Sequence, residues 1–439
     1  MTETESQNFK TRKFEDLNNM GQSATKPTIE IHGTVSPGYE TVKELFENNF
    51  IEGREENAQL CVYVGEEKVV DLWCSQTDTE YSADSLVNVF SATKSLTALA
   101  MASLVDRGLV TYSDKIAQHW PEFAQNGKEN VTIAELMRHE SGLSENWSPL
   151  EVEDTLKENI RNNAVGSLFE KEELHFPSDE VKRDYHAITR GWIANEIFRR
   201  VDPKKRTIGE YLSEEVSGPL KADAYIGLEK DRLNQTAHVK EFEFGKLLKK
   251  SLSTSCCGGS YGYSLGNLMS FFNSMRKMMT GNEKPAFKQY KDYNMSMIGP
   301  LFNDETVRSA EIPSANGNCS ARGLGLVAAA LANKGSINGV EILSPKGWEE
   351  MHRDPTPAIM NVMLETAFTQ GGVNVYEEGS GRHGYIGWHG YGGAVFQWNP
   401  ELKIGFAYCP TLLLWYELFN EKGAIMQQEV TDCVKRLSS

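Results

Sequence analysis

The chain has 439 residues, a length that fits one large enzyme of two lobes better than a single simple domain. Its 45 basic and 61 acidic side chains give a formal net charge of −16. Short groups such as Lys249-Lys250 are the only basic clusters. This argues against nucleic-acid binding, because phosphate neutralisation needs extended clusters of lysine and arginine.

The first 35 residues are polar and contain acidic side chains such as Glu3, Glu5 and Asp16. Secretory signals need an apolar core and mitochondrial presequences avoid acids, so residues 1–35 are expected to be a disordered leader. The seven cysteines have no framework spacing, which is typical of reduced thiols in a cytoplasmic protein. No run of about 20 apolar residues predicts a membrane span.

The first predicted elements are a helix and a hairpin. Apolar side chains recur on one face over residues 40–50, which predicts the helix. Strands over 59–64 and 68–73 follow, and the chain turns between them at Gly65-Glu66-Glu67. These elements open the domain expected over residues 36–439.

The last predicted elements are a second hairpin and a second helix. Strands over 394–398 and 404–408 turn at Asn399-Pro400-Glu401, and a helix over about 418–437 follows. Hairpins near opposite chain ends predict one antiparallel sheet that both ends build and that the terminal helices cover.

These elements predict an α+β protein of two lobes. The sheet lobe is expected from residues of about 36–85 and 385–439, and residues of about 90–370 predict a mainly helical lobe. Residues of about 240–310 are rich in glycine, serine, methionine and aromatic side chains. We expect this segment to be an insertion that roofs a cleft.

The most informative motif is Ser91-Ala92-Thr93-Lys94, which lies between an apolar stretch over 86–90 and an apolar helical run. Ser91 and Lys94 are three residues apart, so their side chains share one helix face. Free N–H groups in the first helical turn favour developing negative charge. A partly desolvated lysine can take the proton of a serine hydroxyl. The motif therefore predicts a nucleophile and its base.

Two other segments match this tetrapeptide pattern. Ser23-Ala24-Thr25-Lys26 lies in the polar leader and precedes Pro27, and Ser274-Met275-Arg276-Lys277 lies in an amphipathic run. Neither has the apolar surroundings of Ser91. A helix N-cap with a solvated lysine is the better interpretation of both.

Two further segments fit the same chemistry. Tyr185 follows Asp184 and precedes a helical run, and a buried tyrosine beside a lysine can move protons. An ordinary core tyrosine is the alternative. The glycine-rich stretch 387–393 leads into the predicted strand at 394, where its backbone can approach a substrate and supply an oxyanion N–H. A simple turn between strands is the alternative.

Taken together, these segments resemble the β-lactamase-like serine hydrolases, which include class C β-lactamases, D-amino-acid peptidases and β-lactamase-fold carboxylesterases. The resemblance covers residues of about 36–435 and implies the β-lactamase/transpeptidase-like fold, with the active site between the lobes. Further segments resemble the family in chain order: Asp106-Arg107-Gly108-Leu109, Trp120-Pro121-Glu122-Phe123, 133–143, 185–192, Ser320-Ala321-Arg322-Gly323 and 328–333.

The resemblance also implies roles for individual residues. Ser91 would be the nucleophile, Lys94 its partner base and Tyr185 the proton shuttle, with no metal or organic cofactor. The oxyanion hole would be the N–H groups of Ser91 and Tyr391. The segment Trp388-His389-Gly390 stands where the family carries Lys-Thr-Gly, and it is expected to bind substrate.

Two positions depart from the class C pattern. Ala187 replaces an asparagine, and Trp388 replaces the lysine of Lys-Thr-Gly. The missing lysine removes a cation that would bind a substrate carboxylate and tune Tyr185. The esterase-like branch tolerates both changes, which favours hydrolysis of a fairly apolar ester or amide over efficient β-lactam hydrolysis. His389 is interpreted as a partial substitute for the lysine or as strand-edge packing, and His139 as a structural hydrogen-bonding residue.

Three alternatives stand beside this hypothesis. Gly258-Gly259-Ser260-Tyr261-Gly262 matches the nucleophile elbow of α/β-hydrolases, but the stretch 249–255 before it is too polar for a buried strand. The chain could instead be a non-catalytic scaffold or binding protein that retained the fold, or a specialised serine peptidase. The expected partner is a small-molecule ester, amide or peptide substrate, with no nucleic acid and no membrane. A homo-oligomer is compatible with the sequence.

Overall fold

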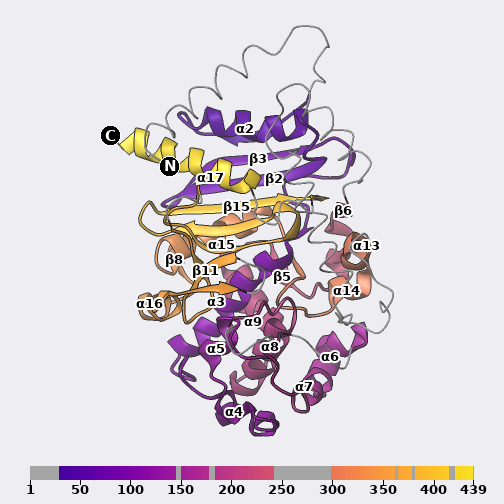
Figure 1. The fold of residues 1–439 in the computed structure, drawn as a ribbon. Coiled ribbons are helices and arrows are strands. Elements are labelled where there is room, and N and C mark those ends of the chain that lie inside the picture. Colours follow the sequence, from indigo (N-terminus) through magenta and orange to yellow (C-terminus); the bar gives the residue numbers. More distant parts are fainter. Residues whose placement is uncertain are drawn as a thin grey trace.

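The computed structural model contains a large antiparallel sheet with helices on both of its faces (Figure 1). The structure describes residues 29–144, 150–176, 183–241, 298–360, 364–377, 381–414 and 421–438.

The sheet has nine strands in the order β1-β3-β2-β15-β14-β13-β12-β11-β10, and the neighbours pair antiparallel. Its centre joins the two ends of the chain, because Ala58 pairs with Pro410 and Val64 pairs with Ile404. This confirms the antiparallel sheet predicted from the two terminal hairpins. The strands are β1 (His32–Val35), β2 (Asn57–Val64), β3 (Glu67–Ser75), β10 (Thr356–Met360), β11 (Leu364–Phe368), β12 (Asn374–Val375), β13 (Ile386–His389), β14 (Val395–Asn399) and β15 (Ile404–Pro410).

Two terminal helices cover one face of the sheet (Figure 1). They are α2 (Glu40–Ile51) and α17 (Glu421–Ser438), and they contact one another. Phe46 of α2 and Val430 of α17 pack with Val62 of β2 in a single apolar core. Burying this apolar surface is what holds the two chain ends together.

A third helix, α15 (Ala321–Ala332), packs against the opposite face. Side chains along a strand alternate between faces, so Phe406 joins the core under α2 while Ala407 joins the core under α15. Gly405 allows the α15 backbone to come close, because a Cβ at this position would lie 2.4 Å from the Ala329 nitrogen. Small residues thus set the distance between this helix and the sheet.

The remaining helices form the second lobe around α3 (Thr93–Asp106), below the sheet in Figure 1. Every side chain from Thr93 to Leu104 is buried, which is typical of a helix in the middle of a core. The other described helices are α4 (Ile116–His119), α5 (Ile133–Met137), α6 (Lys157–Arg161), α7 (Ala164–Phe169), α8 (Thr189–Val201), α9 (Ile208–Leu212), α10 (Gly218–Leu220), α13 (Ile298–Asn303), α14 (Glu305–Ser309) and α16 (Pro345–His352).

Short strands support the start of α3. In a three-stranded sheet of order β4-β7-β5, the central strand pairs Asn318 with Asn88, three residues before Ser91. The short strands are β4 (Val87–Asn88), β5 (Ala224–Ile226), β6 (Lys240–Glu241), β7 (Gly317–Cys319), β8 (Ser336–Ile337), β9 (Val340–Glu341) and β16 (Leu412–Leu413).

The large sheet reaches further into the chain than expected. Strands β10 and β11 belong to it, although they lie within the range 90–370 that was assigned to the helical lobe. Met360 is the only fully buried residue of β10, so this strand lacks the alternation of buried and exposed side chains that marks a half-buried strand. The boundary between the lobes therefore differs from the predicted one. The predicted limit of the leader at residue 35 is also wrong, because His32–Val35 pair with β3 as strand β1 of the sheet.

Several predicted segments lie outside the described residues. They are residues 1–28 of the leader, residues 242–297 of the roof insertion, the segment Gly258–Gly262 and the tetrapeptides at 23–26 and 274–277. The five cysteines within the described ranges are free and buried, as expected for reduced thiols. In the same ranges, none of the helices has the length and apolar character needed to cross a bilayer.

Candidate active site

Ser91 lies in a short 3-10 turn, η1 (Phe90–Ala92), which continues directly into α3. Asn88 fixes the start of the turn, because its Oδ1 accepts the Phe90 N–H at 2.9 Å. Phe90 has a φ of +46°, which is unusual for a bulky residue and indicates local strain. The Ser91 side chain is only partly buried, so its hydroxyl is presented at the head of a buried helix.

Lys94 lies one helical turn further on, and its side chain is completely buried. Its Nζ lies 3.3 Å from the Ser91 Oγ. Two backbone carbonyls also hold this amine, that of Ala187 at 2.7 Å and that of Ser314 at 3.1 Å. These contacts orient the lysine toward the serine.

Tyr185 comes from the loop that precedes α8. Its Oη lies 2.5 Å from the Ser91 Oγ and 3.2 Å from the Lys94 Nζ. The three residues predicted to be nucleophile, base and shuttle are therefore in mutual contact, although Ser91 and Tyr185 are 94 positions apart in the chain.

Burial is the main influence on the two titratable groups around Ser91. It lowers the pKa of Lys94 well below its usual value, and the nearby charge of Arg190 lowers it further. Burial raises the pKa of Tyr185, against the opposing effects of the Ser91 hydrogen bond and of Arg190. At neutral pH these shifts favour an uncharged Lys94 amine and a protonated Tyr185 hydroxyl. A neutral amine has a lone pair that can accept a proton.

The strand β13 brings the glycine-rich segment against the nucleophile turn. A Cβ at Gly390 would lie 2.2 Å from the Val89 carbonyl oxygen, so only glycine allows this approach. Tyr391 begins a second 3-10 turn, η9 (Tyr391–Gly393), and its ring meets that of Phe90 edge-on, with the centroids 5.6 Å apart. The first N–H of such a turn has no partner within the turn, and this makes it a candidate oxyanion donor.

The Ser91 N–H is the second candidate donor. Its neighbours are already engaged, because the Phe90 N–H binds Asn88 and the Ala92 N–H donates to the Val89 carbonyl. The residues predicted for the oxyanion hole, Ser91 and Tyr391, thus occur in two turns that pack together through Phe90.

Trp388 forms an apolar wall beside Tyr185 and Lys94. Its ring stacks on Phe368, with the centroids 5.0 Å apart, and Lys94 Nζ lies 5.5 Å from the ring centroid. The indole N–H donates to the Gly372 carbonyl at 2.8 Å, and the backbone N–H donates to Ser95 Oγ at 3.0 Å. Both contacts hold the third segment in register against α3.

The two histidines singled out in the sequence have defined partners. His389 Nδ1 lies 2.8 Å from the Tyr376 hydroxyl, so this side chain is held at the end of β13. His139 is completely buried and its Nδ1 accepts the His186 N–H at 2.9 Å. Burial holds the pKa of His139 well below its usual value. The hydrogen-bonding role predicted for His139 is the one it has.

Other residues of the site carry no motif of their own. The Ser314 carbonyl and Phe368 approach from separate segments. Ser95 directly follows Lys94 in α3, and Arg190 lies in the first turn of α8, where its guanidinium donates to the Lys94 carbonyl. The one available signal was Arg190 itself, a charged residue amid an otherwise apolar helix start.

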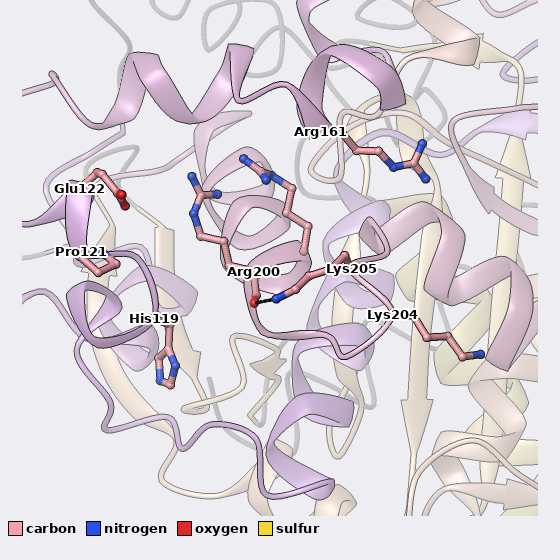
Figure 2. Close-up of a pocket in the computed structure, with 8 residues that line it drawn as sticks. His119, Pro121, Glu122, Arg161, Arg200, Lys204 and Lys205 are labelled. Carbon is pink, nitrogen blue, oxygen red and sulfur yellow. Dashed lines mark hydrogen bonds between the residues drawn. The ribbon is translucent and has the colours of Figure 1, made fainter.

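An open pocket of about 650 Å³ lies elsewhere, at the ends of α6 and α8 (Figure 2). Arg161, Arg199, Arg200, Lys204 and Lys205 line it. Nearby carboxylates pair with most of these cations: Glu196 with Arg199 and Arg200, Glu210 with Arg161, and Glu214 and Glu215 with Lys204. The pocket is therefore part of an ion-pair network and lacks the reactive groups that gather around Ser91.

The sequence profile of the Beta-lactamase family matches residues 42–422, which is most of the chain and includes every residue of the site. The chain belongs to the beta-lactamase family. It is 28% identical over 393 residues to the esterase/beta-lactamase LipL of Mycobacterium tuberculosis, and the match covers 88% of this chain and 83% of LipL.

Solved structures show the same fold. A family VIII carboxylesterase superposes with a TM-score of 0.73 at 25% identity, covering 92% of this chain and 100% of that one. A penicillin-binding protein homologue from Caulobacter crescentus superposes with a TM-score of 0.70, also at 25% identity and with the same coverage. This family member therefore has the β-lactamase/transpeptidase-like α+β fold that the sequence resemblance implied.

Proposed function

We propose that this protein is a serine hydrolase that cleaves ester or amide bonds through an acyl-enzyme on Ser91. The observation that carries the proposal is the contact of Ser91 Oγ with Tyr185 Oη at 2.5 Å and with Lys94 Nζ at 3.3 Å. Relatives named as an esterase/beta-lactamase and a carboxylesterase support a hydrolase.

The acylation step follows from the proton positions in this contact. The two carbonyls of Ala187 and Ser314 accept the two N–H groups of a neutral Lys94, so its lone pair is left to face the hydroxyls. Lys94 takes the Ser91 proton as Ser91 Oγ attacks the substrate carbonyl carbon. The N–H groups of Ser91 and Tyr391 stabilise the oxyanion that forms.

The leaving group departs with a proton from Tyr185. As the bond to the alkoxide or amine breaks, the Tyr185 hydroxyl donates its proton, and protonated Lys94 returns one to the phenolate at a distance of 3.2 Å. Water then attacks the acyl carbon. Its proton passes to Lys94 and finally to Ser91 Oγ, which regenerates the starting state and needs no other reactant.

The walls of the site favour an apolar substrate. Met360, Phe368 and Trp388 form a buried apolar cluster that packs against Tyr185. Trp388 stands at the position where a lysine of the third motif would bind a substrate carboxylate. These features support ester-like substrates without a carboxylate next to the reacting bond, and they argue against efficient β-lactam hydrolysis.

A labelling and turnover experiment tests the proposal. Wild-type protein should react with a fluorophosphonate probe and hydrolyse short-chain p-nitrophenyl esters, with little turnover of nitrocefin. Ser91→Ala should abolish labelling and lower ester turnover by roughly 10³-fold or more, because the nucleophile is lost. Ser260→Ala is the matched control, and it should label like the wild type.

Three outcomes would overturn parts of the proposal. Labelling that survives in Ser91→Ala would remove Ser91 as the nucleophile. Strong nitrocefin turnover would reject the esterase-like preference. Folded wild-type protein that neither labels nor turns over esters, amides or a peptide library would favour a binding protein that retained the fold.

A further inference from the structure

Arg190 is a buried cation directly beneath the catalytic groups. Its side chain is completely buried, and its guanidinium donates to the carbonyl oxygens of Gly372 at 3.1 Å and Lys94 at 3.2 Å. It also lies 3.3 Å from His139 Nε2. No carboxylate pairs with Arg190 in the part of the chain that the structure describes, and its Nε has no hydrogen-bond partner there.

Burying an unpaired charge lowers the free energy of unfolding, so it is expected only where the charge itself has a function. Removing a guanidinium from water without a counter-ion is strongly unfavourable, and buried arginines are normally paired. A structural bridge between two carbonyls would need only a neutral donor such as an amide. The contrast with Arg183 is direct, because that arginine is equally buried but pairs with Glu140.

Arg190 shares one aromatic surface with Lys94. The Arg190 Cζ lies 5.4 Å from the centroid of the Trp388 ring, and Lys94 Nζ lies 5.5 Å from the same centroid. An indole ring tolerates a cation near its face. Arg190 and Lys94 thus lie close to the same indole ring, and the positive field of Arg190 acts on both Lys94 and Tyr185.

We propose that Arg190 is a positioning residue whose buried charge keeps Lys94 an uncharged base and stabilises the phenolate that forms when Tyr185 gives its proton to the leaving group. This inference rests on the proposed hydrolase function. A lysine in the third motif would both tune the proton affinity of the catalytic groups and bind a substrate carboxylate. The inference assigns the first of these two functions to Arg190. Arg190 cannot bind a substrate carboxylate, because its side chain is completely buried.

The other groups that face Arg190 stay in one protonation state near neutral pH. They are Tyr112, His139 and His186, beside Lys94 and Tyr185. Burial lowers the pKa of His186 to about 3 and that of His139 well below its usual value, so both rings are neutral. Burial raises the pKa of Tyr112. Burial lowers the pKa of Arg190 itself to about 9, which leaves it charged at neutral pH.

The test is the pH dependence of Ser91 labelling by a fluorophosphonate, together with kcat/KM for a p-nitrophenyl ester. Arg190→Met removes the charge, so the pKa of Lys94 should rise and less of the neutral base should be present at a given pH. The acidic limb of both pH profiles should move to a pH about one unit higher than in the wild type. At pH values below the limb, the rate of the variant should be roughly tenfold lower than that of the wild type. Arg190→Lys should keep the limb close to that of the wild type.

Arg206→Met is the matched control, because Arg206 is also buried but pairs with Asp202 at the far end of α8. It should lower stability without moving the limb. If Arg190→Met does not fold, Arg190→Gln carries the same expectation, since its amide keeps two N–H donors for the two carbonyls.

The outcomes separate this inference from the proposed function. The inference would be overturned if Arg190→Lys and Arg190→Met lost the same rate and the acidic limb of the pH profile did not move. Arg190 would then only support packing. Wild-type protein that does not label, or a label that survives Ser91→Ala, would instead overturn the assignment of Ser91.

Discussion

At the residue scale, the contacts of Lys94 and Tyr185 account for how the proposed mechanism activates Ser91 without a histidine. Lys94 is held by the carbonyls of Ala187 and Ser314, and its charged form is disfavoured by burial. Tyr185 keeps its proton because burial raises its pKa. In the proposed mechanism the base and the acid are thus different groups that both touch Ser91, and each begins the reaction in the protonation state it needs.

Tyr185→Phe tests this division of roles. The variant keeps the ring against Trp388 but removes the hydroxyl, so the leaving group loses its proton donor. We expect kcat for p-nitrophenyl esters to fall by about 10²–10⁴-fold, with a much smaller change in KM. The loss should be larger for an alkyl ester, whose leaving group is more basic.

Tyr225→Phe is the control for Tyr185→Phe. Its hydroxyl donates to Asp223, and its strand β5 is separated from β4, the strand that precedes Ser91, by β7. The control should leave kcat unchanged. A Tyr185→Phe protein with wild-type kcat on both esters would remove Tyr185 from the proton path.

The sequence could predict Ser91, Lys94 and Tyr185 because each belongs to a short motif with its own local pattern. Arg190 lies in the family-like segment 185–192 but was given no role there, and the carbonyl of Ser314 belongs to no motif. Ser314 meets Lys94 across 220 positions of the chain, and a backbone carbonyl leaves no mark in the residue type. The contacts that tune the base are therefore products of the fold.

At the scale of elements, the site depends on how closely β13 docks against η1. Gly390 permits this contact because a Cβ there would lie 2.2 Å from the Val89 carbonyl oxygen. The two N–H groups proposed for the oxyanion hole belong to the turns on either side. Their separation thus depends on this close backbone contact, beside the packing of the Phe90 and Tyr391 rings.

Gly390→Ala should separate these turns. We expect kcat to fall by about 10²–10³-fold, because the oxyanion donors lose their alignment. Labelling by the fluorophosphonate should slow in parallel. Gly339→Ala is the control: its φ is +76° with open space around it, so it should cost about 1 kcal/mol of stability and leave kcat unchanged. A fully active Gly390→Ala protein would contradict this role of β13.

The elements that the sequence predicted well are those with a clear period. The helix over 40–50 and the hairpin of β2 and β3 occur within two residues of their expected limits. Strands β10 and β12 were missed because their own residues carry little signal: β10 begins with the exposed Thr356 and Pro357, and β12 has only two residues. Their place in the sheet comes from pairing with neighbours.

At the scale of the whole molecule, a buried ion pair joins the two ends of the chain. Lys422 of α17 contacts Glu55, just before β2, and both side chains are completely buried. The Tyr408 hydroxyl of β15 donates to the same carboxylate at 2.5 Å. One charged cluster thus connects helix α17 with strand β15 and with the segment just before β2.

Lys422→Met should weaken this connection. It leaves the Glu55 carboxylate buried without this cation, and we expect a loss of about 3–5 kcal/mol in the free energy of unfolding, measured by denaturant titration. The double variant Glu55→Gln/Lys422→Met should recover part of the loss, because no buried charge remains. A Lys422→Met protein as stable as the wild type would show that the pair contributes nothing to stability.

The central pairing of β2 with β15 also has a consequence for synthesis. Cys61 pairs with Ala407, so β2 leaves the ribosome long before its partner exists. At a synthesis rate of roughly 5–20 residues per second, the edge of β2 that pairs with β15 stays unpaired for tens of seconds. An unpaired strand edge invites association with other chains. Nascent chains interrupted before β15 should therefore aggregate and require chaperones, and they should not yield a smaller active enzyme.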